Sequence, residues 1–497
     1  MGDARPPRLA LLRFGGELGT KARATRRQFR RRLLYNLRDA LASAGTPAHI
    51  EVSHDRLYAH LPELPPVGTE APPRDHPLLR VFGIQSVSFV ERHPAPDLAS
   101  VVHTGEALFR EHVRGRRFAV RARRVGERSA IRVDPRAVER DLGSALLPVS
   151  AGVDLSHPEA TVHIELSEDT ASYFSERLPG PGGLPLGVEG RAVALVSGGF
   201  DSAVAAWQLQ RRGVALDYVF CNLGGHSHLV GAARVAAVLA GRWSYGCRPR
   251  LHALDFAPLA EAIRKHTQAR YWQVILKRMM LRAAEVVARR RRALAIVTGD
   301  AVGQVSSQTL ANLSVVSRAT ELPILRPLVG TNKDEIIAAA TRIGTFELSK
   351  VVGEYCAMTP SRPATRATLA VVEAEEARLP AGLVEGTVAA GSVLDLRDLD
   401  LRTLDAPGLA TSRVPAGAVL IDLRPLAQYR EAHHPDALHL DFENAARAYP
   451  SFDRSRTYVL SCEFGLLSAH LAERMRGDGF DAYHLSGGQR ALMKLLG

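Results

Sequence analysis

The chain has 497 residues, and at roughly 100–200 residues per domain this length predicts three or four domains. Apolar residues make up 46% of it and charged residues 23%, which excludes a collagen, a disordered tail and a disulfide scaffold. The net charge of +12 predicts an anionic partner such as nucleic acid. No apolar run approaches the ~18 residues of a membrane span and no signal-peptide core follows the N-terminus, so we expect a cytoplasmic protein without a membrane partner.

The chain has four cysteines, which are Cys221, Cys247, Cys356 and Cys462. No two of them are spaced as CxxC, so neither a secreted disulfide framework nor a zinc or iron–sulfur site is indicated, and no metal-ligating residues are predicted. Any chemical role must belong to individual thiols.

The N-terminal part combines basic helices with short strands. Residues 1–40 carry eleven Lys or Arg against three acids, and residues 21–38 show the apolar spacing of a basic amphipathic helix after a strand at 9–12. A strand near 49–52 or a second helix from about Leu57 follows. Over about 80–175, predicted strands at 86–90, 118–123 and 161–166 alternate with helices at 98–109 and 137–146. Eight arginines lie between Arg110 and Arg128, which fits either a solvated face or a nucleic-acid contact.

A Pro/Gly-rich segment near residue 180 ends this part, and an α/β rhythm follows it. Strands are predicted at 191–196, 216–222, 250–254 and 294–298, with helices at 202–211, 229–240 and 258–290, which together predict a doubly wound sheet. Residues 360–412 begin helically and then read as a connecting segment. The last ~85 residues restart the α/β pattern with strands at 418–423 and 458–461 and a helix at 468–477.

The first predicted strand of the doubly wound sheet runs into Ser197-Gly198-Gly199-Phe200-Asp201-Ser202 and then a helix. Two glycines permit a turn whose backbone N–H groups face an anion, and the helix N-terminus adds a favourable dipole. The segment lacks the lysine of the GxxxxGK[ST] loop. SGGxDS is the PP-loop signature of enzymes that split ATP between the α and β phosphates to adenylate a substrate, and Asp201 is placed to hold Mg²⁺ or to orient pyrophosphate.

A second chemical motif lies near the C-terminus, where a strand leads to Cys462 and a loop before a helix. Backbone N–H groups at a helix N-terminus favour an anionic sulfur, either thiolate or persulfide. The surrounding pattern resembles rhodanese: Asp422 and Arg424, then Tyr429 and His433–His439, then Cys462xxGly465xxSer468, then Ser486-Gly487-Gly488. Leu467 stands where many rhodaneses have a polar residue, which suits a protein persulfide donor better than thiosulfate.

A basic α+β N-terminus, a PP-loop domain and a rhodanese-like domain together resemble the tRNA 4-thiouridine synthetase (ThiI) family over nearly the whole chain. The most specific stretches are 197–202, 220–225 (FCNLGG), 275–280 (ILKRMM), 303–313 (GQVSSQTLANL), 325–328 (LRPL) and 354–356 (EYC). Asp300 replaces the family's usual glutamate. The resemblance implies a multidomain α/β fold with a ferredoxin-like domain at 1–75, a THUMP domain at 76–178, a PP-loop domain at 186–375, a linker at 376–412 and a rhodanese-like domain at 413–497.

The resemblance also implies functional residues. Cys462, Cys356, Asp201 and Lys333 are expected to be catalytic, although a first-turn lysine and a lone cysteine would otherwise be read as structural. Cys221 and Cys247 keep a structural interpretation. The residues expected to bind ATP are Leu195, Val196, Ser197, Gly198, Gly199, Asp201, Ser202, Phe220, Asn222, Lys277, Gly299 and Gln308, and those expected to bind RNA are Lys21, Arg26, Arg30, Arg114, Arg116 and Arg117.

By the same resemblance, ATP with Mg²⁺ adenylates O4 of uridine 8 in tRNA and is converted to AMP and pyrophosphate. A cysteine desulfurase loads sulfur onto Cys462, the persulfide replaces the adenylated oxygen to give 4-thiouridine, and Cys356 resolves it by forming a Cys356–Cys462 disulfide. A homodimer is expected.

Three alternatives stay open. The chain could carry sulfur for thiamin thiazole synthesis to a sulfur-carrier protein, which needs Cys462 but not the PP-loop. It could be an RNA-binding module with degenerate catalytic domains, which the intact 197–202 segment, Lys333 and Cys462 argue against. It could also thiolate another base or a small molecule.

Overall fold

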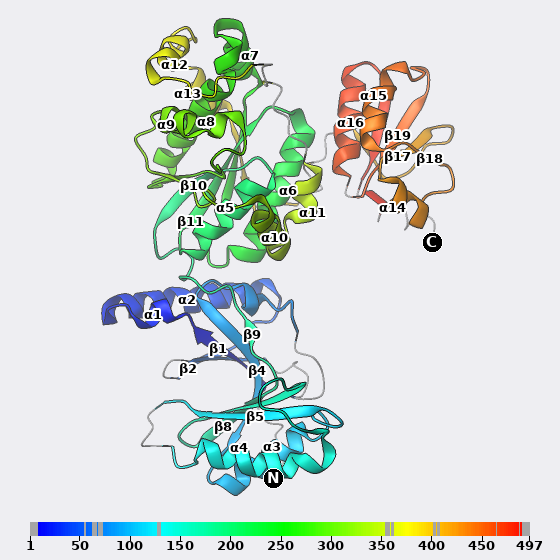
Figure 1. Ribbon diagram of the computed structural model, residues 1–497. Coiled ribbons are helices and arrows are strands. Elements are labelled where there is room, and N and C mark those ends of the chain that lie inside the picture. The colour runs from blue at the N-terminus through cyan, green and yellow to red at the C-terminus, as the bar shows by residue number, and fades with distance from the viewer. Residues whose placement is uncertain are drawn as a thin grey trace. The chain divides into compact units, whose positions relative to one another are not determined.

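The computed structural model describes residues 8–53, 56–61, 67, 73–126, 131–352, 358, 362–400, 404, 408–463, 465–486 and 488–489. The chain forms two compact units, whose helices and strands are labelled in Figure 1. The first comprises residues 1–189, 211–213 and 245–247, and the second comprises residues 190–210, 214–244 and 248–497. None of the helices in the described ranges combines the length and the apolar character that crossing a membrane would require.

The first unit is built on a nine-stranded sheet in the order β2-β3-β1-β4-β8-β7-β5-β6, with β9 also paired to β4. The long strand β4 joins the two halves of this sheet, since it pairs antiparallel with β1 on one side and with β8 on the other. The strands are β1 (Arg8–Phe14), β2 (Ile50–Ser53), β3 (Arg56–His60), β4 (Ile84–Pro94), β5 (Arg117–Arg124), β6 (Gly152–Val153), β7 (Ala160–Leu166), β8 (Thr170–Phe174) and β9 (Leu178–Pro179).

The helices of this unit bury apolar stripes against the sheet. In α2 the buried side chains Phe29, Leu33, Leu37 and Leu41 recur every four residues, which places them on one helical face. The helices α3 and α4 begin at Asp97 and Asp134, whose carboxylates accept backbone N–H bonds as N-caps. The helical elements are α1 (Gly16–Gly19), α2 (Arg23–Ser43), α3 (Leu98–Phe109) and α4 (Pro135–Leu146), with short 3-10 turns η1 (Pro77–Arg80) and η3 (Leu147–Val149).

The second unit contains a six-stranded sheet in the order β14-β13-β10-β11-β12-β15. All neighbouring pairs are parallel except β12 with β15. Because β11 lies on one side of β10 and β13 on the other, the direction of winding reverses at β10, which is the place where open α/β sheets bind ligands. The strands are β10 (Arg191–Leu195), β11 (Ala215–Asn222), β12 (Arg250–Asp255), β13 (Ile296–Val297), β14 (Ile324–Leu325) and β15 (Ser392–Asp395).

The helices of this sheet supply most of its core. The central helix α8 buries Ile275, Met279 and Ala283 in the same cluster as Val193 of β10 and Val219 of β11. The helical elements are α5 (Phe200–Arg211), α6 (Gly225–Trp243), α7 (Ala257–His266), η4 (Ala269–Tyr271), α8 (Trp272–Arg291), η5 (Ser306–Gln308), α9 (Leu310–Ser317), α10 (Lys333–Ile343), α11 (Phe346–Val351), α12 (Leu369–Glu376) and α13 (Leu383–Ala390).

A smaller five-stranded parallel sheet follows in the order β16-β20-β19-β17-β18. Its core includes Ile421, Leu460, Leu471 and Met475. The elements are β16 (Ala410–Thr411), β17 (Val419–Asp422), α14 (Leu426–Glu431), β18 (Ala437–His439), α15 (Phe442–Ala448), η7 (Tyr449–Ser451), β19 (Thr457–Ser461), α16 (Leu466–Gly477) and β20 (Asp481–Leu485).

Two parts of the structure differ from what the sequence pattern predicted. The helix considered from about Leu57 is the strand β3, which lies between β1 and β2. The segment expected to connect the last two domains contains α13 and β15, and Ser392–Asp395 pairs antiparallel with Arg250–Ala253. A strand of four residues is too short to be recognised by the alternation of apolar and polar side chains. Its hydrogen-bond partners lie on the neighbouring strand, far away in the sequence.

Candidate functional site

The expected phosphate loop joins β10 to α5 at the point where the sheet reverses its winding. The hydroxyl of Ser202 accepts a hydrogen bond from the Ser197 backbone N–H at 3.2 Å and donates to the Gly199 carbonyl at 3.1 Å. The Gly199 N–H donates to the Ser197 hydroxyl at 3.4 Å. These bonds hold the loop closed on itself at the N-terminus of α5, where the helix dipole favours an anion.

Two glycines allow other segments to approach this loop closely. Gly198 has φ +80°, and a Cβ atom there would lie 2.9 Å from Cγ1 of Val352. A Cβ atom on Gly299, after β13, would lie 2.7 Å from the Asp201 carbonyl carbon and from the Ser202 backbone nitrogen. Gly299 therefore lets the end of β13 rest against the first turn of α5.

Asp201 and Lys333, both expected to be catalytic, lie together. The Lys333 Nζ atom donates to both carboxylate oxygens of Asp201, at 3.0 and 3.1 Å, and the Gln304 side chain donates to the same carboxylate at 3.0 Å. The ammonium also lies 5.5 Å from the centre of the Phe200 ring. The side chains of Lys333 and Asp201 are 45% and 27% exposed, so an incoming polyphosphate can reach both.

A second charged cluster lies next to this pair around Asp300. Its carboxylate accepts from Lys277 at 2.7 Å, from Thr298 at 2.8 Å, from Gln308 at 3.1 Å and from Arg326 at 3.3 Å. Burial alone would raise the pKa of Asp300, but the Lys277 ammonium and these donors hold that pKa well below its usual range. Asp300 is therefore a fixed anion that orients Lys277 and Gln308, both of which were expected to bind ATP.

The end of β11 brings in Phe220 and Asn222, as expected, and the first turn of α6 brings in His228, which sequence reasoning missed. His228 is 7% exposed, lies edge-on to the Phe220 ring at 4.7 Å, and hydrogen-bonds the Ser197 backbone. Burial lowers the pKa of His228 to about 4, while the bond to Ser197 opposes the shift. A neutral imidazole thus buttresses the phosphate loop. The signal for it was its place in the first turn of α6, directly after the Gly224-Gly225 turn.

The expected sulfur residue, Cys462, follows β19 at the start of the loop that leads into α16. Its Sγ atom lies 3.4 Å from the hydroxyl of Ser468 and accepts from the Ser468 backbone N–H at 3.4 Å. Cys462 is 4% exposed. The sulfur atom therefore faces the first turn of α16, where backbone N–H groups stabilise negative charge.

The chain around this sulfur is held from two sides. The Gln489 N–H donates to the Cys462 carbonyl at 3.0 Å, and the adjoining Gly488 has φ +61°. A Cβ atom on Gly488 would lie 2.5 Å from the carbonyl oxygens of Cys462 and Glu463. The Arg424 guanidinium pairs with Asp422 at 2.7 Å and lies 3.9 Å from the Glu463 carboxylate.

The remaining expected residues are placed as follows. Cys356 falls outside the described residues, so its approach to Cys462 stays a prediction. Arg114 and Arg117 pair with acids, Arg114 with Glu111 and Arg117 with Asp154 and Glu159. Arg26 donates to backbone carbonyls of Gly19 and Lys21. Lys21 lies over the Phe29 ring, and Arg30 and Arg116 are exposed. The RNA contacts of these residues also stay predictions.

The arrangement can bind a nucleoside triphosphate and hold Mg²⁺. Within the described parts of the chain, no group of three or more His, Cys, Asp or Glu side chains could form an all-protein metal cage. Mg²⁺ is commonly bound by one or two carboxylates together with substrate phosphates and water. Asp201, partly exposed at the mouth of the phosphate loop, fits that donor set.

Three family models match separate parts of the chain. The family model described as thiamine biosynthesis protein (ThiI) matches residues 187–380, a ThiI ferredoxin-like domain matches residues 9–88, and a rhodanese-like domain matches residues 408–494. A tRNA sulfurtransferase from Pyrobaculum aerophilum is 37% identical over 95% of both chains, and one from Thermoplasma acidophilum is 38% identical over 82% of this chain and 83% of that protein.

Solved structures agree with these matches. A crystal structure of a 4-thiouridine synthetase–RNA complex with bound ATP superimposes with a TM-score of 0.68 and 28% identity, covering 78% of this chain and 99% of that one. The expected multidomain fold, with a ferredoxin-like N-terminus, a PP-loop domain and a C-terminal rhodanese-like domain, is confirmed.

Proposed function

The chain belongs to the ThiI family of tRNA sulfurtransferases, and from that premise we propose that it is an ATP-dependent tRNA sulfurtransferase that makes 4-thiouridine from uridine 8 in the cytoplasm. One observation carries the proposal: the Asp201–Lys333 pair stands at a phosphate loop in the same chain that presents Cys462 at the N-terminus of α16. Adenylation and sulfur delivery need these two kinds of site.

The first half-reaction uses the phosphate loop. Uridine O4 attacks the α-phosphorus of ATP, the bond to the β-phosphate oxygen breaks, and pyrophosphate leaves while AMP stays on O4. Lys333 neutralises the charge that develops on the α-phosphate, and the loop N–H groups bind the departing pyrophosphate. Asp201 would hold Mg²⁺ there, and the bound ion would supply further screening of the same charge. When phosphates arrive, Lys333 exchanges its bond to Asp201 for a bond to the substrate.

The second half-reaction uses Cys462. A cysteine desulfurase transfers sulfur to its thiolate, and the terminal sulfur of the persulfide attacks C4 of the base and displaces AMP with the old oxygen. Cys356 then attacks the Sγ atom of Cys462 in the disulfide to the base, which releases 4-thiouridine and leaves a Cys356–Cys462 disulfide. A cellular dithiol supplies the two electrons that reopen it. The Ser468 N–H and hydroxyl stabilise the anionic sulfur before attack.

The test is nucleoside analysis of unmodified tRNA after incubation with the protein, Mg-ATP, cysteine and a desulfurase. We expect 4-thiouridine only with ATP and intact Cys462, so Cys462→Ser abolishes it. Cys247→Ser, which changes a half-buried thiol beside Arg32, is the matched control and keeps the product. Absence of 4-thiouridine from the wild type, while sulfur still loads onto Cys462, would contradict the proposal.

The name of the family model, a thiamine biosynthesis protein, favours a second candidate function. In this role the Cys462 persulfide passes its sulfur to a carrier protein for thiazole synthesis, and the phosphate loop is not used. Asp201→Ala separates the two functions, because it should remove tRNA thiolation and leave sulfur transfer to the carrier unchanged.

A further inference from the structure

The face of the nine-stranded sheet opposite its helices carries a cluster of arginines. On β1, Ala10 and Leu12 pack with the α2 residues Leu33 and Leu37, so Leu11 and Arg13 point to the other face. On β8, Tyr173 packs with α3 residues, so Phe174 points to that same other face. Leu11, Val90 and Phe174 form a small apolar cluster of their own there.

One buried carboxylate organises the cluster. Glu165 on β7 is 1% exposed and pairs with three guanidinium groups: Arg13 at 2.7 Å, Arg56 at 3.4 Å, and Arg123. Arg13 also donates to Ser88 at 2.9 Å. These residues come from both halves of the sheet, β1 and β3 on one side and β5 and β7 on the other. A single negative charge cannot neutralise three positive ones, so the site keeps an excess of positive charge.

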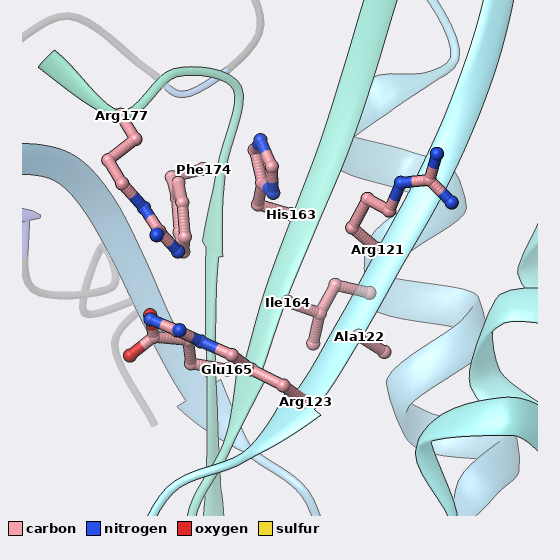
Figure 2. Close-up of a pocket in the computed structure, with 8 residues that line it drawn as sticks. All are labelled: Arg121, Ala122, Arg123, His163, Ile164, Glu165, Phe174 and Arg177. Atoms are coloured by element: carbon pink, nitrogen blue, oxygen red, sulfur yellow. The ribbon is translucent and has the colours of Figure 1, made fainter. Parts of the chain in front are cut away.

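A fourth guanidinium adds to this excess. Arg177 follows β8 and runs beside Phe174 toward Glu165 (Figure 2), yet it forms no hydrogen bond or ion pair with any residue that the structure describes. Burial and the charges of Arg123 and Arg56 lower the pKa of Arg177, and Glu165 only partly opposes them. Burial likewise lowers the pKa of Arg13 to about 10. Burial is the largest cause of both shifts, and the neighbouring guanidinium charges add to it.

The cluster opens into a pocket of about 390 Å³. The His163 ring stacks on the Phe174 ring at 4.9 Å and 14°, which gives the pocket a stiff aromatic wall (Figure 2). Burial and the nearby arginines Arg177, Arg13 and Arg123 lower the pKa of His163 to about 4. The ring is therefore neutral at physiological pH and leaves the binding of charge to the arginines.

We infer that this pocket binds a phosphate group of the RNA strand, with Arg177 and Arg123 as its donors and Glu165 as the residue that positions Arg123. The inference rests on the proposed function, which supplies RNA as the source of the phosphate. Guanidinium groups match phosphate oxygens in a planar, two-pronged geometry. The pocket lies apart from Arg114 and Arg117, whose charges are already paired with acids on the same domain.

The experiment measures binding of unmodified tRNA to the full chain by fluorescence anisotropy over a range of salt concentrations. Arg177→Gln should weaken binding about fivefold and reduce the slope of log affinity against log salt by about one, since one phosphate contact is lost. Arg177→Lys keeps the charge but not the two-pronged geometry, so it should restore the salt slope and only part of the affinity. The matched control is Arg140→Gln, which removes the same charge from an exposed arginine paired with its neighbour Asp141.

Each outcome has a definite meaning. Equal weakening by Arg177→Gln and Arg140→Gln would show an effect of net charge alone and would overturn the pocket. If Arg177→Gln binds tRNA as tightly as the wild type, and the wild type forms 4-thiouridine, the pocket is overturned and the proposed function stands. Wild-type protein that binds tRNA through Arg177 but forms no 4-thiouridine would overturn the function alone, and wild-type protein that binds no tRNA would overturn both. Inorganic phosphate that binds the wild type in the millimolar range and Arg177→Gln more weakly, while both proteins bind tRNA equally well, would assign the pocket to a free anion instead.

Discussion

Lys333 and Asp201 are 132 residues apart in the chain, yet the Lys333 ammonium donates to both oxygens of the Asp201 carboxylate at 3.0 and 3.1 Å. The pair joins the N-terminus of α10 to the first turn of α5. Because the lysine is nearly half exposed, the ion pair adds little to stability. In the proposed reaction, the pair keeps a cation beside the phosphate loop, and we expect a polyphosphate to replace the carboxylate as its partner.

We predict that Lys333→Gln lowers kcat for ATP–pyrophosphate exchange by about a hundredfold or more, the usual loss when one donor to a developing oxyanion is removed. The melting temperature should change little, since the pair is exposed. Lys265→Gln, on the exposed end of α7, is the control and should keep full exchange. A Lys333→Gln variant with wild-type exchange would show that the lysine has only a surface role.

Gly299 offers a steric test of the nucleotide site. The Cβ atom of Gly299→Ala would lie 2.7 Å from backbone atoms of Asp201 and Ser202, so the start of α5 must shift. A displacement near 1 Å at a reacting group costs about a hundredfold in rate, and we expect pyrophosphate exchange to fall by that order. Gly330→Ala, where a Cβ atom meets nothing within 4 Å, should leave exchange intact.

His228 should act through the position of the phosphate loop. His228→Leu removes the hydrogen bond to the Ser197 backbone and the edge contact with Phe220. We expect a higher KM for ATP and a smaller effect on kcat, because the lost interaction shapes the loop rather than the reacting atoms. His228→Gln keeps an N–H donor and should recover part of the affinity. Equal losses for both variants would point to a purely structural role.

The same histidine predicts a dependence of stability on pH. The pKa of His228 is about 4 in the folded protein and ~6.5 in an unfolded chain, so the unfolded state binds the proton more readily. The contribution of the neutral ring is fully present above about pH 6.5 and is lost as the pH falls toward about 4. The advantage in melting temperature of the wild type over His228→Leu should therefore shrink between about pH 7.5 and about pH 5. A constant difference across this range would contradict a buried neutral ring.

Gly488 offers a matched test of the sulfur loop. Gly488→Ala puts a Cβ atom 2.5 Å from the carbonyl oxygens of Cys462 and Glu463 at a φ of +61°. We expect the cysteine loop to move and the rate of persulfide loading onto Cys462 to fall by about tenfold or more. Gly417→Ala has a similar φ of +80° but open space around the new atom, so it separates the steric effect from backbone strain. Loss of loading in both variants would assign the effect to backbone strain alone.

Features with a local sequence signal could be predicted without the structure. The turn at 197–202 and the cysteine loop at 462–468 each lie between a strand and a helix. A few adjacent residues specify the backbone conformation that each motif requires. Apolar spacing also predicted the long helix α2, with Phe29, Leu33 and Leu37 on one face. The edge strand β15 carried no such signal, because it has only four residues and its hydrogen-bond partners lie on β12, far away in the chain.

Contacts between residues far apart in the chain could not be predicted in this way. His228 against Ser197, Asp300 with Lys277 and Arg326, and Glu165 with Arg13, Arg56 and Arg123 all depend on strand order and register. The sequence showed that the N-terminal part is rich in arginine, but not which arginines form ion pairs with acidic residues. Pairing depends on distances across the folded sheet: the carboxylate of Glu165, 42 residues from Arg123, reaches it only because β5 and β7 lie side by side.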